Sequence, residues 1–370
     1  MNQQNIATKS ARNSALELLR IIAMLLIVLS HICAHSGFVI DGGSVSLNRL
    51  LVQWGALGGL GNNLFVLISG YFLCTRGTKA PSLGKLFVQV WFYSISLFVV
   101  CKFAFDYDYS LIALAEVFLP TIFQEYWFFT AYVLLALLSP FLNLFLESVS
   151  KTGLRKLLLL AGVLWVLIPT FTRMQMGGNK LTHFMFLYLI GAYFRKYPEN
   201  LFSRKGLRRL VTLASFALLF LSTLAFEVLG TKWSIFDSHG KFFFESNTLL
   251  VMGASLGLFS MAIYGKAFFN PLINGIAGCT FGVYLIHDNP AVRKLLWRQL
   301  LPHGAYMDSP FLIVGMLFSV TAVFLLCTGI EYLRQKTLAK PMLFLYEKVT
   351  GLLLRWGSGI WGFARRKFGL

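Results

Sequence analysis

Long apolar segments separated by short polar connections recur from residue 14 to residue 333. Runs of about 17 to 25 mostly apolar residues are long enough to cross the hydrocarbon core of a bilayer as helices. The pattern predicts about ten transmembrane helices, at residues 14–34, 50–73, 84–104, 125–147, 154–171, 180–195, 208–229, 245–265, 271–288 and 310–333. The predicted fold class is therefore all-α, a polytopic membrane bundle. Because the expected number of crossings is even, both termini should lie on one side.

Composition supports a membrane protein. Hydrophobic residues make up 57% of the 370 residues and charged residues only 13%, which excludes an ordinary soluble protein. The five cysteines show no CxxC or metal-ligand spacing. We therefore expect neither a disulfide framework nor a zinc site.

The formal net charge of +18 raises the possibility of nucleic-acid binding, but the distribution of the cations favours a membrane topology. With both termini in the cytoplasm, roughly 24 of the 33 Lys and Arg residues fall on the cytoplasmic side. The expected partners are then anionic membrane lipids rather than nucleic acid. We divide the chain into a transmembrane domain, residues 1–333, and a basic amphipathic cytoplasmic tail, residues 334–370.

The first apolar segment contains ELLRIIAMLLIVLSH, residues 17–31, which keeps Glu17, Arg20 and His31. A charge near the bilayer centre costs about 2.5 to 3.5 kcal/mol, so such residues usually face protein or a water-filled cavity. Arg20 and His31 lie on one helix face within roughly 20°, and roughly 16 Å apart along the axis. This spacing predicts a polar stripe. In the alternative interpretation, Glu17 and Arg20 form a surface pair and His31 satisfies the helix end.

The length of this stripe suits a donor with a phosphorylated head and a long reactive arm, as acyl-coenzyme A has. Arg20 would bind the anionic head, because guanidinium offers several donors to phosphate. His31 would accept a proton from an alcohol. Arg76, Lys79 and Lys85 are candidates to assist Arg20, although a positive-inside loop explains them equally well.

Further polar and aromatic residues lie at predicted helix ends that should share the extracytoplasmic face. Glu125 opens the fourth segment, His183 opens the sixth, and His287 and Asp288 close the ninth. Tyr126 and Trp127 suit stacking on sugar rings or anchoring at the membrane interface. His31 and His35 are spaced like a metal pair, but no third ligand accompanies them, so no metal site is predicted.

The chain resembles the acyltransferase-3 family of integral membrane acyltransferases, particularly members that decorate bacterial surface polysaccharides. The matching stretches, in family order, are LELLRIIAMLLIVLSH, NNLFVLISGYFL, YWFFTAYVLLALLSPFLN, HFMFLYLIGAYFRKY and TFGVYLIHDNP. Arg20 and His31 correspond to the family's Arg and His pair, and Ser69 begins SGY, which corresponds to an SGF-like motif. Many members carry an RxxR motif after the second helix, where this chain has RGTK.

The resemblance implies transfer of an acyl group, usually acetyl, from cytoplasmic acyl-coenzyme A to a hydroxyl of an extracytoplasmic or lipid-linked bacterial polysaccharide. The expected location is the bacterial inner membrane, with acetyl-coenzyme A as co-substrate and no tightly bound cofactor. A transporter or flippase for a glycolipid or small solute is the alternative, with the polar stripe as its pathway. The residues left as candidates are, for catalysis, His31, Arg20 and Glu17; for the donor, Arg20, Ser69, Arg76, Lys79 and Lys85; and for the acceptor, Glu125, Tyr126, Trp127, His183, His287 and Asp288.

Overall fold

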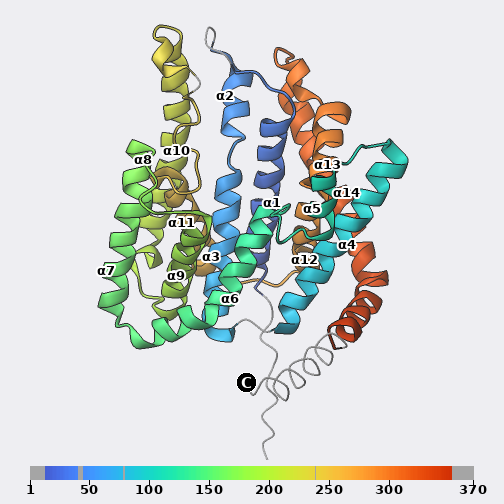
Figure 1. Cartoon of the computed structure of the whole chain (residues 1–370). Helices are drawn as coiled ribbons and strands as arrows, with labels where there is room; N and C mark the ends of the chain where they lie inside the picture. The colour runs from blue at the N-terminus through green and yellow to red at the C-terminus, as the bar shows by residue number, and fades with distance from the viewer. Residues whose placement is uncertain (1–12, 41–44, 78–79, 238, 352–370) are drawn as a thin grey trace, which may run out of the picture.

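The computed structural model describes residues 13–40, 45–77, 80–237 and 239–351, and within these ranges the chain is helical without strands. Fourteen α-helices with both ends inside the described ranges connect through short turns and brief 3-10 and π-helical stretches (Figure 1). Their bounds are α1 Ser14–His35, α2 Leu47–Trp54, α3 Gly58–Arg76, α4 Ala80–Phe105, α5 Leu111–Phe118, α6 Trp127–Ser148, α7 Lys151–Gly162, α8 Ile168–Thr172, α9 Lys180–Lys196, α10 Lys205–Gly230, α11 Leu249–Tyr264, α12 Pro271–His287, α13 Pro290–Lys294 and α14 Leu312–Thr337.

Seven helical stretches in the described ranges are long and apolar enough to cross a membrane. They are Ser14–His35, Leu47–Arg76, Ser82–Phe105, Trp127–Ser148, Lys151–Thr172, Lys205–Gly230 and Leu312–Thr337. Helices α11 and α12 are apolar but shorter, and α9 has 17 residues. The all-α membrane architecture is therefore confirmed. The number of about ten crossings and the cytoplasmic termini stay predictions.

The helix boundaries differ from the expected segments at several places. The second segment is broken after Trp54, and α3 begins only at Gly58, where an added Cβ would lie 2.7 Å from Ser30 Oγ of α1. Helix α6 begins at Trp127, so Glu125 lies in the preceding turn. Helix α14 continues to Thr337, residues 339–351 are also helical, and residues 352–370 of the expected tail lie outside the described residues.

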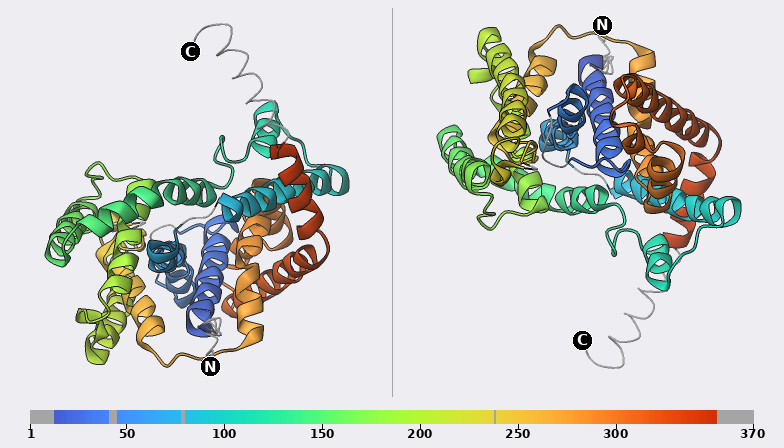
Figure 2. Two further views of the ribbon diagram at one scale, coloured as in Figure 1. Left: turned by 90° about the horizontal axis from the view of Figure 1, so that it is seen from below. Right: turned by 90° about the horizontal axis from the view of Figure 1, so that it is seen from above.

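Helix α1 lies at the centre of the bundle, between two groups of helices (Figure 2). It packs against α3, α11, α12 and α14. Ala23 belongs to the apolar cluster with α3, α9 and α11, whereas Val28 belongs to the cluster with α4, α12 and α14. Helix α1 is therefore the wall that both halves of the bundle share.

Helices α1 and α12 start together and run in the same direction. The Ser14 N–H donates to the Phe268 carbonyl at 2.9 Å, and Ser14 Oγ donates to Asn274 Oδ1 at 2.8 Å. Each helix rises about 1.5 Å per residue, and His31 and His287 follow their helix starts by nearly the same number of residues. The two histidines are therefore level with each other.

Helices α3 and α9 cross at backbone distance. A Cβ added at Gly70 would lie 2.4 Å from the Tyr188 carbonyl oxygen, and one added at Gly191 would lie 2.4 Å from the Leu67 carbonyl oxygen. Small residues at such crossings allow close packing of helices in membranes. This crossing fixes α3, which carries Asn62, Asn63 and Ser69, against the rest of the bundle.

Candidate functional site

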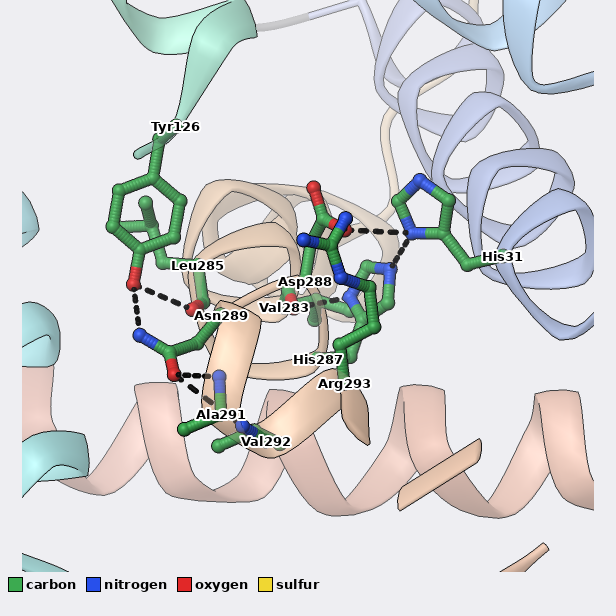
Figure 3. A network of polar contacts seen from close by, with 10 residues as sticks. All are labelled: His31, Tyr126, Val283, Leu285, His287, Asp288, Asn289, Ala291, Val292 and Arg293. Atoms are coloured by element: carbon green, nitrogen blue, oxygen red, sulfur yellow. Dashed lines mark hydrogen bonds and ion pairs between the residues drawn. The ribbon is translucent and has the colours of Figure 1, made fainter. Parts of the chain in front are cut away.

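The level ends of α1 and α12 bring two histidine rings into contact (Figure 3). His31 Nδ1 lies 2.9 Å from His287 Nε2, and His287 Nδ1 lies 2.6 Å from the Val283 carbonyl oxygen. His287 is fully buried, whereas the His31 side chain keeps 20% of its surface exposed. A chain of hydrogen bonds therefore leads from the backbone of α12 to a partly open imidazole.

This chain fixes which nitrogen of each neutral ring carries hydrogen. A carbonyl oxygen can only accept, so His287 Nδ1 must donate to Val283 and His287 Nε2 is left as an acceptor. His31 Nδ1 then donates to His287 Nε2. The lone pair of His31 is therefore on Nε2, which points away from His287 in Figure 3 and has no hydrogen-bond partner among the described residues.

Asp288 places a carboxylate between His31 and Arg293. Its Oδ1 lies 3.5 Å from His31 Nδ1 and 3.4 Å from Arg293 Nη1. Burial raises the pKa of Asp288 above its ordinary value, and the positive charge of Arg293 and the neighbouring His287 oppose that rise. When ionised, the carboxylate stabilises positive charge on the His31 ring.

Glu125 and Tyr126 join this group through Asn289 rather than by touching His31. Asn289 Nδ2 lies 3.0 Å from Glu125 Oε1 and 2.9 Å from Tyr126 Oη, and Ser94 Oγ donates to Glu125 Oε2 at 2.7 Å. The Asn289 oxygen also caps α13 by accepting from the Ala291 N–H. Burial raises the pKa of Glu125 to about 7, against the hydrogen bonds from Ser94 and Asn289. The start of α6 is thus fastened to the end of α12.

An inner cavity of about 360 Å³ lies between α1, α3, α6 and α12. Its wall includes Arg20, Ser69, Asn62, Ile27 and Tyr284, with aromatic rings from α6 and α12. Arg20 is the only charged residue among the described residues of this wall. His31 follows the wall residue Ile27 by about one helical turn, and His287 follows the wall residue Tyr284 by about one turn. The cavity therefore extends from Arg20 towards the histidine pair.

Glu17 holds Arg20 in that wall. Arg20 Nη1 donates to both carboxylate oxygens of Glu17 at 2.8 Å. The Glu17 side chain is only 4% exposed and that of Arg20 23% exposed. The pair that the alternative interpretation placed at the surface does form, but its carboxylate is buried and its guanidinium lines a cavity.

An outer cavity of about 700 Å³ lies beside the inner one. Its wall contains Trp127, His183, Lys180, Lys241 and further polar residues of the loops before α9 and α11. Asn62 belongs to the walls of both cavities. The volume is in the range of small-molecule binding sites.

His183 has a fixed tautomer in the outer cavity. Asn63 Nδ2 donates to the Ser246 carbonyl at 2.8 Å, so Asn63 Oδ1 accepts from His183 Nε2 at 2.9 Å. The lone pair of His183 is then on Nδ1, which is buried and without a hydrogen-bond partner in the described chain. Lys180 Nζ lies 4.2 Å from the centre of the Trp127 ring. The cavity therefore offers an aromatic ring beside a cation, whereas the His183 acceptor is enclosed by protein.

The other candidates for donor binding lie apart from the inner cavity. Arg76 and Lys85 are exposed and do not belong to the cavity wall, and the Arg76 guanidinium stacks 5.4 Å from the Phe72 ring centre. Lys79 lies outside the described residues. Ser69 is in the wall, and its Oγ donates to the Phe65 carbonyl. Assistance by Arg76, Lys79 and Lys85 stays a prediction.

Some residues of the site were not candidates from sequence. Asn289 and Arg293 were missed because they follow the ninth apolar segment, where polar residues are ordinarily hydrated; the Asn-Pro pair that starts α13 was their only sequence signal. Thr280 lines the inner cavity, but its sequence position indicates only the interior of a helix. In the described part of the chain, no group of three or more His, Cys, Asp or Glu side chains is arranged to hold a metal ion.

Comparison with known proteins identifies the chain at the level of its family. A family model described as an acyltransferase domain matches residues 13–328. Neither curated proteins nor solved structures gave a match. The matched range contains every site residue described above. Because it spans most of the sequence, this chain belongs to the acyltransferase-3 family.

Proposed function

We propose that the chain transfers an acyl group, acetyl in the first instance, from cytoplasmic acyl-coenzyme A to a hydroxyl of an extracytoplasmic or lipid-linked polysaccharide in the bacterial inner membrane. Membership of the acyltransferase-3 family supports acyl transfer in a membrane. The observation that carries the finer proposal is the placement of His31, which has a free Nε2 and follows Ile27 of the Arg20-containing cavity wall by about one helical turn.

Acyl-coenzyme A binds in the inner cavity with its phosphates at the Arg20 end and its thioester at the His31 end. Its phosphates meet Arg20, because a guanidinium provides several donors to phosphate oxygens. Arg76, Lys79 and Lys85 add positive charge on the same side of the membrane. The pantetheine arm then runs roughly 16 Å along α1 and brings the thioester to His31.

The acceptor sugar occupies the outer cavity. Trp127 offers a ring for stacking, and His183 forms part of the same wall. Glu125, Tyr126, His287 and Asp288 form the polar end of the site. Asn62 belongs to the walls of both cavities, so the donor in the inner cavity and the acceptor in the outer cavity are bound on opposite sides of Asn62.

The reaction follows from the orientation of His31. Its Nε2 takes the proton from the sugar hydroxyl while the hydroxyl oxygen bonds to the thioester carbon. The carbon–sulfur bond then breaks, and the proton passes from Nε2 to the leaving thiolate. The products are the sugar ester and free coenzyme A. His287 and Asp288 stabilise the transient imidazolium. A covalent relay, in which Nε2 first accepts the acyl group, uses the same nitrogen.

An uncharged acyl group suits the inner cavity better than an acidic one. Arg20 is the only charged residue in the described wall, and Glu17 already pairs with it. A succinyl carboxylate inside this cavity would meet no cation of the described wall other than Arg20, and an unpaired buried charge is strongly unfavourable. This favours acetyl over succinyl.

The test compares incorporation of radiolabelled acetyl from acetyl-coenzyme A into surface polysaccharide by membranes that contain wild type, His31→Ala or His239→Ala. His239 is exposed, its Nδ1 hydrogen-bonds the Asp237 carbonyl and its ring packs against Phe226 and Phe242; because it belongs to neither cavity wall, it is the matched control. His31→Ala should lower incorporation at least about 100-fold, since general acid–base catalysis contributes 10²- to 10⁴-fold. His239→Ala should match wild type.

Near-normal incorporation by His31→Ala, at equal amounts of inserted protein, would contradict the proposal. Label that stays on the wild-type protein and then moves to glycan would favour the covalent relay. Movement of glycolipid across the membrane without any incorporation of label would favour the transporter.

A further inference from the structure

A second large hollow lies away from the candidate site, on the side of the bundle formed by α7, α9, α10 and α11 (Figure 1). We call it the lateral groove. Its volume is about 800 Å³, and most of its wall is apolar, including Leu159, Val163, Phe186 and Leu256. None of its residues belongs to the walls of the inner or outer cavity.

One end of the lateral groove is positively charged. Lys151, Arg155 and Arg204 belong to its wall, and Glu199 is the one acidic residue of that wall. Three cations and one carboxylate leave a net charge of +2 there. Arg155 and Arg204 are exposed, and neither forms an ion pair with another described residue. The two arginines are therefore available to an external anion, whereas Lys151 Nζ also lies 5.2 Å from the centre of the Tyr197 ring.

The apolar part of the lateral groove is about as long as one membrane leaflet is deep. From Arg155 to Leu167 the wall follows α7 and the π-helical stretch Val163–Leu167. That distance is about 18 Å at helical rise, and half of a bilayer's hydrocarbon core is about 15 Å. A chain that starts at the cations and follows the wall ends near the middle of the membrane.

We propose that the lateral groove is a binding site for one anionic phospholipid, with its phosphate against Arg155, Arg204 and Lys151 and an acyl chain along Val163 and Phe186. Basic pockets between transmembrane helices bind anionic lipid headgroups. A zwitterionic lipid gains less electrostatic binding free energy at this site, because its amine partly cancels the phosphate charge that meets the cations. This site is independent of the proposed acyl transfer and concerns a different surface of the bundle.

The test measures lipid retained by the full chain after purification in detergent and exposure to equal amounts of phosphatidylglycerol and phosphatidylethanolamine. Native mass spectrometry gives the ratio of bound anionic to bound zwitterionic lipid. Wild type should be enriched in phosphatidylglycerol. Replacing both arginines, Arg155→Gln with Arg204→Gln, should weaken phosphatidylglycerol binding roughly 25-fold, about fivefold for each cation removed.

Two further variants separate the site from general effects of charge or folding. Lys205→Gln with Arg209→Gln removes two exposed cations of α10 outside the groove wall, and it should bind phosphatidylglycerol as wild type does. Gly162→Leu keeps every charge but fills the groove; its Cβ would lie 3.9 Å from Phe186 Cζ, an ordinary contact, so the helix itself is undisturbed. It should also lose the lipid.

Equal binding of the two lipids by wild type would overturn the proposal. So would an equal loss in the arginine variant and in the Lys205 and Arg209 control, because the effect would then be one of overall charge. Unchanged binding in Gly162→Leu would show that the chain does not lie in the groove.

Discussion

At the scale of single residues, the site depends on which nitrogen of each histidine is free. His287 donates to the Val283 carbonyl and His183 donates to Asn63 Oδ1, which settles the free nitrogen of each ring, and His287 in turn settles it for His31. Sequence periodicity predicted that His31 and His287 lie near one membrane face. It could not predict the tautomers, because these depend on contacts between residues far apart in the chain.

His287 acts in this arrangement as a positioning residue. His287→Leu removes the acceptor for His31 Nδ1, so we expect kcat to fall roughly 100-fold with little change in KM for acetyl-coenzyme A. His287→Gln should retain much more activity, because its Oε1 can accept where His287 Nε2 does. Steady-state kinetics with both substrates checks this. Equal activity of the two variants, or an effect on KM alone, would show that His287 does not orient His31.

Glu125 should make stability depend on pH. Burial raises its pKa from 4.5 to about 7, so the folded protein binds this proton more tightly than the unfolded chain. Its stabilising contribution is therefore complete below pH 4.5 and is lost as pH rises to about 7. Glu125→Gln keeps the neutral form. Its Tm in detergent should rise relative to wild type across this interval and then stay constant.

Glu147→Gln, which changes an exposed carboxylate of α6, is the control for this measurement and should follow the wild-type pH profile. A difference between Glu125→Gln and wild type that does not change with pH would mean that Glu125 titrates normally in the folded protein.

At the scale of helices, the parallel pair α1 and α12 and the crossing of α3 with α9 determine where the polar groups meet. The apolar segments predicted the helices themselves, and each of the ten expected segments contains one. They did not predict the break between α2 and α3 or the late start of α6. Runs of apolar residues show which residues are shielded from water, whereas glycines and buried polar groups decide where a helix stops.

Gly70 tests the crossing of α3 with α9. Gly70→Ala should lower the free energy of unfolding by about 1 to 3 kcal/mol, as overpacking does, because the added Cβ would meet backbone atoms of Tyr188 that cannot turn aside. Gly329→Ala in α14 is the matched control, since nothing lies within 4 Å of its Cβ position. Thermal unfolding in detergent compares them; equal Tm values for Gly70→Ala and wild type would contradict a tight crossing.

At the scale of the whole molecule, the bundle has two cavities on two sides of Asn62 and a separate lateral groove. The spacing of Arg20 and His31 predicted a polar stripe on one helix. Asn62 and Asn63 belong to the second apolar segment, where an amide needs hydrogen-bond partners inside the bundle. Their roles required the tertiary structure, because the two cavity walls combine helices that are separated by more than one hundred residues.

The sparse charge of the inner cavity has an energetic consequence for a membrane enzyme. Moving one elementary charge across the membrane changes its energy by about 2.3 kcal/mol per 100 mV. If coenzyme A keeps its phosphates at Arg20 and the glycan stays in the outer cavity, the acyl group passes the boundary at Asn62 in exchange for the hydroxyl proton, so no net charge crosses. Such a step does no electrical work, so the modification could proceed at the same rate in energised and de-energised cells and would need no coupled ion flow.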